Sequence, residues 1–200
     1  GTDMKKWIAL LTLAFICVLS GCTDKETPRS PAETVTAFLN GIQNQDSEAL
    51  VASSDWKEFD RKAFSIEDSD YMDNVDKKLQ KQAFEKMMYF EHKEGNESIQ
   101  DDQASVQVEI KQYDFSNSLK TGMEKAEKKV QELSKKDVSD ADTEAAIATI
   151  LFESLQKTDT MKTTTVTVQL KKEKDAWLVS SKNDQLQKQL SANLNILQDQ

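Results

Sequence analysis

Residues 161–180 read MKTTTVTVQLKKEKDAWLVS. In the first half, every second side chain is apolar or a threonine in the same phase, namely Thr164, Val166, Val168 and Leu170. A period of two is typical of a half-buried strand. Lys171–Asp175 follows as a polar turn, and Ala176–Ser181 returns as a strand. Because a short turn joins the two strands, they form a hairpin, and the sheet is expected to be antiparallel.

Another strand is predicted upstream, over Gln103–Phe115. Its apolar residues again alternate with polar ones: Ala104, Val106, Val108 and Ile110. Tyr113 and Phe115 continue the pattern in the opposite phase. We therefore expect a β-bulge near Lys111-Gln112, because one extra residue turns every later side chain to the other face.

The other apolar residues recur with helical spacing. Ser30-Pro31-Ala32-Glu33 is a typical helix start, with Ser as the cap and Pro at the first helical position. One predicted helix carries Leu119, Met123, Ala126, Val130 and Leu133 on a single face. The predicted helices are 31–44, Asp46–Ser53, Tyr71–His92 ended by Gly95-Asn96, a pair within 116–160, and a C-terminal helix from about Asp184.

A different pattern precedes the first helix. Met4-Lys5-Lys6-Trp7 is followed by an apolar run of 12 residues, Ile8 to Leu19. Export signals have apolar runs of about 7–15 residues, whereas a membrane-spanning helix needs about 20. Residues 1–21 are therefore predicted to be a signal peptide. Residues 1–3, upstream of Met4, are left out of the fold.

The apolar run ends in Leu19-Ser20-Gly21-Cys22, which resembles the lipobox of bacterial lipoproteins. The resemblance implies cleavage before Cys22 and a diacylglyceryl group on its thiol. Acyl chains hold a protein on a bilayer because each buried CH₂ contributes about 0.8 kcal/mol. Residues 22–31 would then be a lipidated tether. The expected location is the extracytoplasmic face of a Gram-positive cell membrane, with the membrane as a partner through Cys22.

Alternatives to this reading are a plain cleaved signal peptide and an uncleaved anchor, both with Cys22 incidental. A further alternative concerns the removed segment, because Ala14–Gly21 resembles fragments that some Gram-positive cocci release as peptide signals.

Composition excludes several classes of function. Cleavage before Cys22 removes Lys5, Lys6 and Asp3, which changes the formal net charge from −9 to −10. So acidic a chain is not expected to bind nucleic acid, because phosphate contacts need a basic surface. Cys17 would leave with the signal and Cys22 would be acylated, so no disulfide, thiolate metal site or cysteine nucleophile is expected.

The residues of common catalytic centres are scarce. His92 is the single histidine, and we expect it at a charged helix end. Without a second histidine, no catalytic triad or histidine-rich metal site is predicted. The acidic residues of Ile66–Asp76 are interpreted as helix-capping residues rather than calcium ligands. Ser139–Asp142 resembles a capping box that starts another helix, and the acidic residues of Asp137–Glu144 are spread around that helix start, so they are not expected to converge on a metal ion. No cofactor is predicted.

The order of the elements resembles the cone-shaped α+β fold of the nuclear-transport-factor-two-like superfamily. Pro31–Asp46 is similar to the start of many such domains, and Lys171–Val179 is similar to their last hairpin. More narrowly, the chain is similar to a family of Gram-positive lipoproteins of unknown function with this fold. The resemblance implies one domain, 32–200, in which a curved antiparallel sheet packs on N-terminal helices. A helical insertion, 116–160, and a C-terminal helix are additions to it.

Such a cone leaves a cavity at its wide end. Aromatic side chains either line that cavity or form the core: Trp56, Tyr89, Phe90, Tyr113, Phe115 and Trp177. The leading hypothesis is a non-catalytic lipoprotein that binds a small ligand, a peptide or an envelope protein. One alternative is a structural or interaction protein that uses Leu119–Leu155 as its contact surface. The other is a hydrolase or isomerase that uses a buried carboxylate in the cone.

Overall fold

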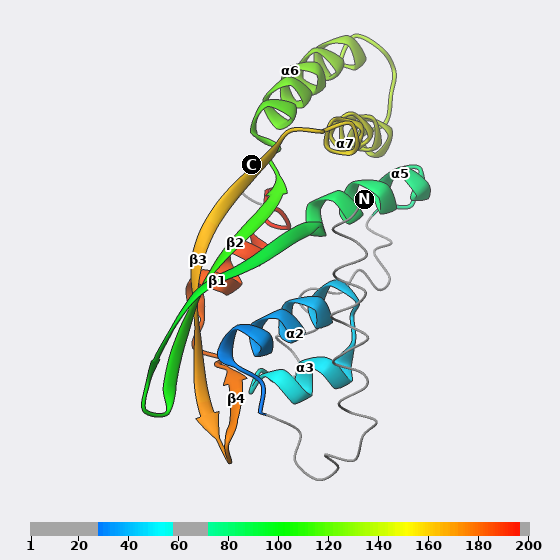
Figure 1. Ribbon diagram of the computed structural model, residues 1–200. Helices are drawn as coiled ribbons and strands as arrows, with labels where there is room; N and C mark the ends of the chain where they lie inside the picture. Colours follow the sequence, from blue (N-terminus) through cyan, green and yellow to red (C-terminus); the bar gives the residue numbers. More distant parts are fainter. Residues whose placement is uncertain (1–27, 58–71, 197–200) are drawn as a thin grey trace, which may run out of the picture.

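The computed structural model describes residues 28–57 and 72–196. Outside this range lie the predicted signal with Cys22, most of the acidic segment 66–76, and residues 197–200. The described chain is an α+β structure in which helices lie on one side of an open antiparallel sheet and beyond its end (Figure 1). In chain order the elements are α2 Pro31–Gln43, α3 Ser47–Ser53, α5 Lys77–Met88, β1 Phe90–Gln100, β2 Gln103–Tyr113, α6 Ser116–Leu133, α7 Asp140–Gln156, β3 Met161–Glu173, β4 Ala176–Val179 and α8 Asp184–Ser191.

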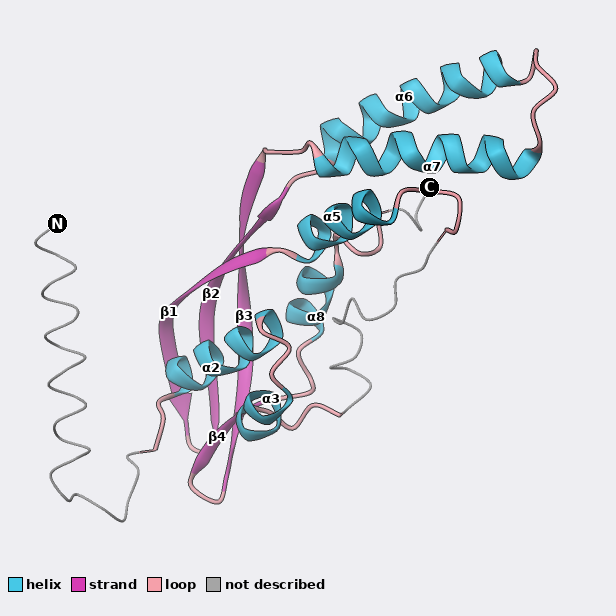
Figure 2. Cartoon of the chain, turned by 90° about the vertical axis from the view of Figure 1, so that its right-hand side faces the viewer, coloured by secondary structure: helices cyan, strands magenta, loops and turns pink. Residues whose placement is uncertain are grey.

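The sheet has the strand order β1-β2-β3-β4, and every neighbouring pair is antiparallel. It bends around α2 and α3, which cover one of its faces (Figures 1 and 2). The central strands are in register, with Val106 opposite Val168 and Val108 opposite Val166. All four of these valines are buried. The alternating pattern that predicted strands here is therefore confirmed, as is the hairpin of β3 and β4.

The predicted β-bulge at Lys111-Gln112 is wrong. β2 stays in register there with both neighbours, and Gln112 continues the buried side of the strand. Gln112 is tolerated inside because its amide donates to the Gln189 carbonyl (3.1 Å) and its oxygen accepts from Gln189 Nε2 (2.7 Å). The irregularity of the sheet lies instead in β1, between Glu94 and Glu97.

The predicted helix Tyr71–His92 is wrong at its C-terminal end. Helix α5 ends at Met88, the chain turns extended at Tyr89, and β1 begins at Phe90. His92 therefore lies in a strand and not at a charged helix end. The predicted start of this helix is wrong as well: Tyr71 lies outside the described residues, and the helix begins only at Lys77, with Asp76 as its cap. The helical spacing that ends in Met87 and Phe90 continues across the boundary by coincidence, because Phe90 is the first inward residue of β1.

The helix starts follow from capping side chains. Ser30, Asp46, Asp76 and Ser139 each accept a hydrogen bond from the backbone N–H three residues later. Such a bond satisfies one of the N–H groups that the first turn of a helix leaves free. The expected starts of α2, α3 and α7 are thereby confirmed.

Two clusters of buried apolar residues lie on different parts of the molecule. The larger one fills the space between the sheet, α2, α3 and α8. The smaller one joins α5 to α7 and includes Phe84, Phe115, Phe152 and Leu155. Leu194 packs against both clusters. Helices α6 and α7 lie antiparallel beyond the end of the sheet (Figure 2).

Candidate functional site

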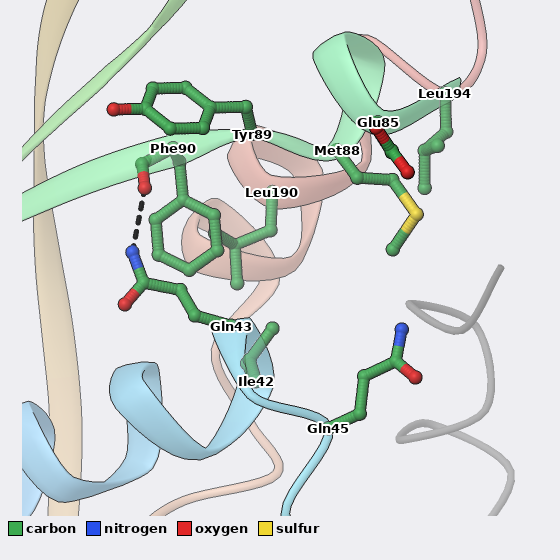
Figure 3. Close-up of a pocket in the computed structure, with 9 residues that line it drawn as sticks. All are labelled: Ile42, Gln43, Gln45, Glu85, Met88, Tyr89, Phe90, Leu190 and Leu194. Atoms are coloured by element: carbon green, nitrogen blue, oxygen red, sulfur yellow. Dashed lines mark hydrogen bonds between the residues drawn. The ribbon is translucent and has the colours of Figure 1, made fainter. Parts of the chain in front are cut away.

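A pocket of about 300 Å³ opens where α2, α5, β1 and α8 meet (Figure 3). Its apolar wall consists of Ile42, Phe90 and Leu190, which are buried, and of Met88 and Leu194, which are half-buried. Its polar rim consists of Gln43, Gln45, Glu85 and Tyr89. An apolar wall with a few polar groups at the mouth is the usual composition of a small-molecule site.

The pocket exists because two elements end beside each other. Helix α2 ends at Gln43, and Gln43 Nε2 donates to the Phe90 carbonyl at 2.6 Å (Figure 3). This bond fixes the start of β1 against the end of α2. The side chain of Met88, the last residue of α5, then lies across the opening from Gln45 (Figure 3).

Hydrogen bonds continue from the pocket along the whole of α2. Asn40 Oδ1 lies 2.8 Å from His92 Nε2, and the Ala32 N–H donates to Glu97 Oε2 at 3.0 Å. Asn40 is two steps of four residues from Ala32, and Gln43 is three residues further on. Residues three or four apart share a face of a helix, so all three lie on one face of α2. They meet β1 residues of falling number, so α2 runs antiparallel to the edge strand.

His92 and Glu94 form the centre of this contact. His92 Nδ1 is hydrogen-bonded to Glu94 Oε1, and the two side chains are only 8% and 14% exposed. Burial alone raises the pKa of Glu94. His92 lowers that pKa through its hydrogen bond and its electrostatic attraction. Hydrogen bonds from the Glu94 backbone and from the Thr36 side chain lower it further, so the pKa lies below its usual value.

The aromatic residues proposed from sequence are not gathered in one place. Tyr89 and Phe90 line the pocket. Trp56 and Phe115 are buried in different apolar clusters. Tyr113 lies outside the pocket, where its ring packs against that of Tyr89 in a tilted arrangement with centroids 5.4 Å apart. Trp177 packs in the larger cluster and also borders a separate surface hollow beside Lys174 and Asp175.

Helix α8 and the end of α2 supply pocket residues that sequence reasoning did not select. Helical spacing in the sequence places Leu190 and Leu194 on one apolar face of the last helix, and Ile42 on that of the first. The spacing of apolar residues identifies a buried face, but it does not say which part of that face remains uncovered. Gln43 and Gln45 carry no sequence signal for a binding site.

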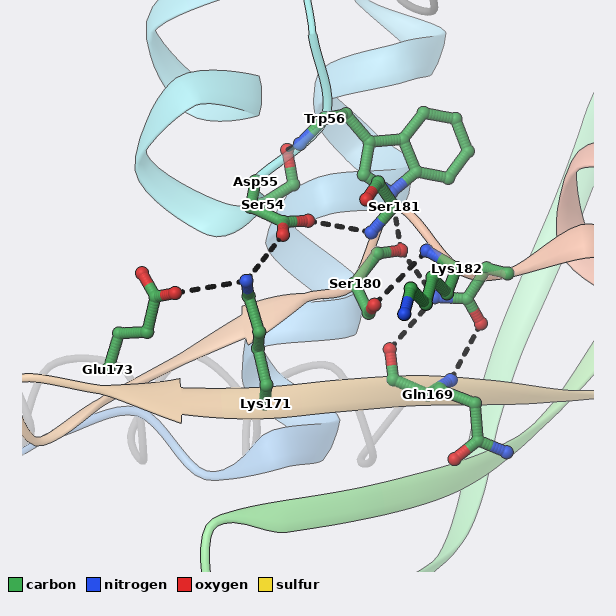
Figure 4. A network of polar contacts seen from close by, with 10 residues as sticks. Ser54, Asp55, Trp56, Gln169, Lys171, Glu173, Ser180, Ser181 and Lys182 are labelled. Atoms are coloured by element: carbon green, nitrogen blue, oxygen red, sulfur yellow. Dashed lines mark hydrogen bonds and ion pairs between the residues drawn. The ribbon is translucent and has the colours of Figure 1, made fainter.

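A second polar network joins the end of α3 to the β3–β4 hairpin (Figure 4). Asp55 Oδ1 accepts from the Ser181 N–H at 2.6 Å, and Asp55 Oδ2 pairs with Lys171 Nζ at 2.7 Å. Hydrogen bonds to Asp55 and Glu173 raise the pKa of Lys171. Trp56 Nε1 donates to the Ser180 carbonyl at 2.8 Å. Each polar group is satisfied by the fold itself, so this network is structural.

Residues 28–57 and 72–196 contain no group of three or more His, Cys, Asp or Glu side chains placed to hold a metal ion. Among the same residues, no helix has the length and apolar character needed to cross a bilayer. Glu85, the carboxylate at the pocket mouth, is exposed. The pocket chemistry is therefore that of an apolar surface with hydrogen-bonding groups at its rim.

Comparison with known proteins gave no match to a family model, a curated protein or a solved structure.

Proposed function

We propose that the chain is a lipoprotein, anchored through Cys22 on the outer side of a cell membrane, whose domain binds a small apolar ligand or a peptide side chain. The observation that carries the binding proposal is the pocket between α2, α5, β1 and α8. The observation that carries the anchoring proposal is the segment Leu19-Ser20-Gly21-Cys22. The fold we assign is of the nuclear-transport-factor-two-like type, in which a bent sheet encloses helices.

The pocket sets the chemistry of the ligand. A volume of about 300 Å³ lies at the lower end of the range for small-molecule sites. Ile42, Phe90 and Leu190 offer only apolar contacts. Gln45 and Glu85 at the rim accept hydrogen bonds. The ligand class is therefore an aromatic or branched aliphatic group that carries an amine or amide at one end.

Binding is tested by NMR of methionine methyl groups labelled with ¹³C, titrated with apolar small molecules and cell-wall peptides. The chain has 6 methionines, and Met88 is at the pocket. A ligand in the pocket is expected to shift the Met88 methyl signal and to raise the melting temperature. Met88→Trp fills the opening and also removes the reporter methyl group, so it is tested by the melting temperature, which the ligand should no longer raise. Val51→Trp, at a side chain that is 60% exposed on α3, is the matched control and should keep both the Met88 shift and the higher melting temperature.

Anchoring is tested separately by metabolic labelling with an alkyne-bearing fatty acid. We expect label in the membrane fraction for the natural chain and for Cys17→Ser. We expect none for Cys22→Ser, because the acyl group needs the Cys22 thiol. Equal labelling of both variants, or recovery of the natural chain from the cytosol, would contradict the lipid anchor and leave the pocket proposal standing.

A further inference from the structure

Helix α6 has two different faces, and its neighbour α7 covers only one of them. Gly122 and Ala126 are buried against α7, where a side chain at position 122 would meet Ser154. About a quarter turn away lie Leu119, Met123 and Val130. Met123 is 42% and Val130 40% exposed, and these are among the largest exposed apolar side chains of the described chain.

The face that α7 leaves uncovered, which we name the α6 seam, comprises the exposed side chains of Lys120, Met123, Glu127 and Val130 and the half-buried side chain of Leu119. At about 100° per residue, these five positions fall within about 100° of the helix circumference, so they share one side of the helix. A shallow surface hollow runs along this side and is lined by Leu119, Lys120, Met123 and Glu127 among others.

Charge along the α6 seam follows a self-complementary order. Lys120 lies toward its N-terminal end and Glu127 toward its C-terminal end. Within the described chain, neither side chain takes part in an ion pair. If a second α6 is laid antiparallel on the first, Lys120 faces Glu127 of the other copy, and Glu127 faces its Lys120. Leu119 faces Val130 in the same arrangement.

The charged pair is centred between residues 123 and 124 and the apolar pair between residues 124 and 125, a difference of about 1.5 Å along the helix, so one antiparallel arrangement brings both pairs within side-chain reach. We propose that two copies of this chain associate through their α6 seams, antiparallel and about a two-fold axis beside Met123. Two-fold interfaces bring the same patch of both copies together, so each complementary pair occurs twice. Flanking charges of this kind set the orientation of paired helices.

The dimer is expected to be weak in solution, because a single pair of helices buries little area. Confinement of both copies to a surface raises their effective concentration. Association is therefore expected to be strongest where the chains are held together, as on a membrane. The dimer does not depend on the pocket described above, and either proposal can fail without the other.

The test is sedimentation equilibrium of the full chain in density-matched detergent, over a wide range of protein concentration. Lys120→Glu or Glu127→Lys places like charges together twice per dimer, so we expect each to raise the dissociation constant by about tenfold. The double variant K120E/E127K restores opposite charges and should return it to near the natural value. Met123→Lys puts a charge in the apolar centre and should prevent association.

Lys128→Glu is the matched control, because it makes the same charge change on the opposite side of α6, and the dimer should survive it. Position 128 is exposed, as are 120, 123 and 127, so circular dichroism should show every variant folded. All variants share residues 1–27, so association through that segment would be equal in each. A monomeric natural chain, no effect of the single reversals, or no recovery in the double variant would overturn the proposal.

Discussion

At the scale of single residues, Glu94 couples the edge strand to the protonation state of the protein. Its folded-state pKa is lowered, so it stabilises the fold at pH values above the ordinary glutamate pKa. That stabilisation is lost as the pH falls through the folded-state pKa. The pH window concerned lies below about 4.3.

Glu94→Gln should therefore lower the free energy of unfolding near pH 7, and the difference from the natural chain should shrink toward pH 3. Urea unfolding at both pH values measures this. Glu109→Gln, at an exposed site on the neighbouring strand, should show no such convergence. An equal loss of stability at both pH values for Glu94→Gln would show that its charge does not stabilise the contact with His92.

Asp55 and Lys171 allow a backbone hydrogen bond to be compared with an exposed ion pair. Asp55→Ala removes the acceptor of the Ser181 N–H and should cost about 1–2 kcal/mol in urea unfolding. Asp55→Asn keeps that acceptor and should cost much less. Lys171→Met should leave the unfolding midpoint unchanged, because solvent screens the charge of Lys171. A larger loss for Lys171→Met than for Asp55→Ala would reverse this ranking.

At the scale of elements, the contact of α6 with α7 depends on the absence of a side chain at position 122. A Cβ atom there would lie 2.6 Å from Ser154 Oγ and 3.0 Å from Ser154 Cβ. Gly122→Ala gains about 1 kcal/mol of helix propensity, but overpacking typically costs about 1–3 kcal/mol. We expect a net loss of stability.

Ser154→Gly makes room for the new methyl group. In a double-mutant cycle read by urea unfolding, G122A/S154G should therefore show a favourable coupling energy. Thr121→Ala, at the exposed neighbouring position, controls for helix propensity and should cause no loss. Additive effects of the two changes would mean that the helices adjust without strain.

A strand could be predicted from the sequence when its inward side chains are apolar, but not when they are polar and hydrogen-bonded to another element. β2 and β3 were predictable because their inward residues are nearly all aliphatic and recur with a period of two. β1 was not, because its inward residues after Phe90 are His92 and Glu94. Those polar residues are satisfied by Asn40 and Thr36 of α2. The polar inward residues of β1 can therefore be recognised only once α2 is known to pack beside the strand.

At the scale of the whole molecule, the two apolar clusters predict two levels of stability. Leu155 is fully buried in the α5–α7 cluster, and Leu→Ala changes at such sites cost about 2–5 kcal/mol. Hydrogen exchange of Leu155→Ala should therefore show reduced protection in α5 and α7, with β2 and β3 less affected. Val108→Ala, at an equally buried site in the sheet, should reduce protection in both regions. Equal losses everywhere for both variants would indicate one cooperative unit.

The coarse fold could be predicted, but the site could not. Apolar spacing identified the buried faces of α2 and α8, which include Ile42 and Leu190, but not that of α6, where Met123 and Val130 are exposed. The pocket arises because α2, α5 and α8 end close together without filling the space between them. No local pattern encodes such a gap, since it depends on distances between segments about 150 residues apart.

The open sheet has two edge strands, β1 and β4, and each is protected from further strand pairing in a different way. β4 is only four residues long, and Ser54 and Asp55 bond to its last residue, Val179. β1 has an irregular register near Gly95 and exposed charges at Glu91 and Lys93. Neither border offers a flat template on which another polypeptide can add strand by strand. Even at high local concentration, the folded protein is therefore expected not to form amyloid-like fibres.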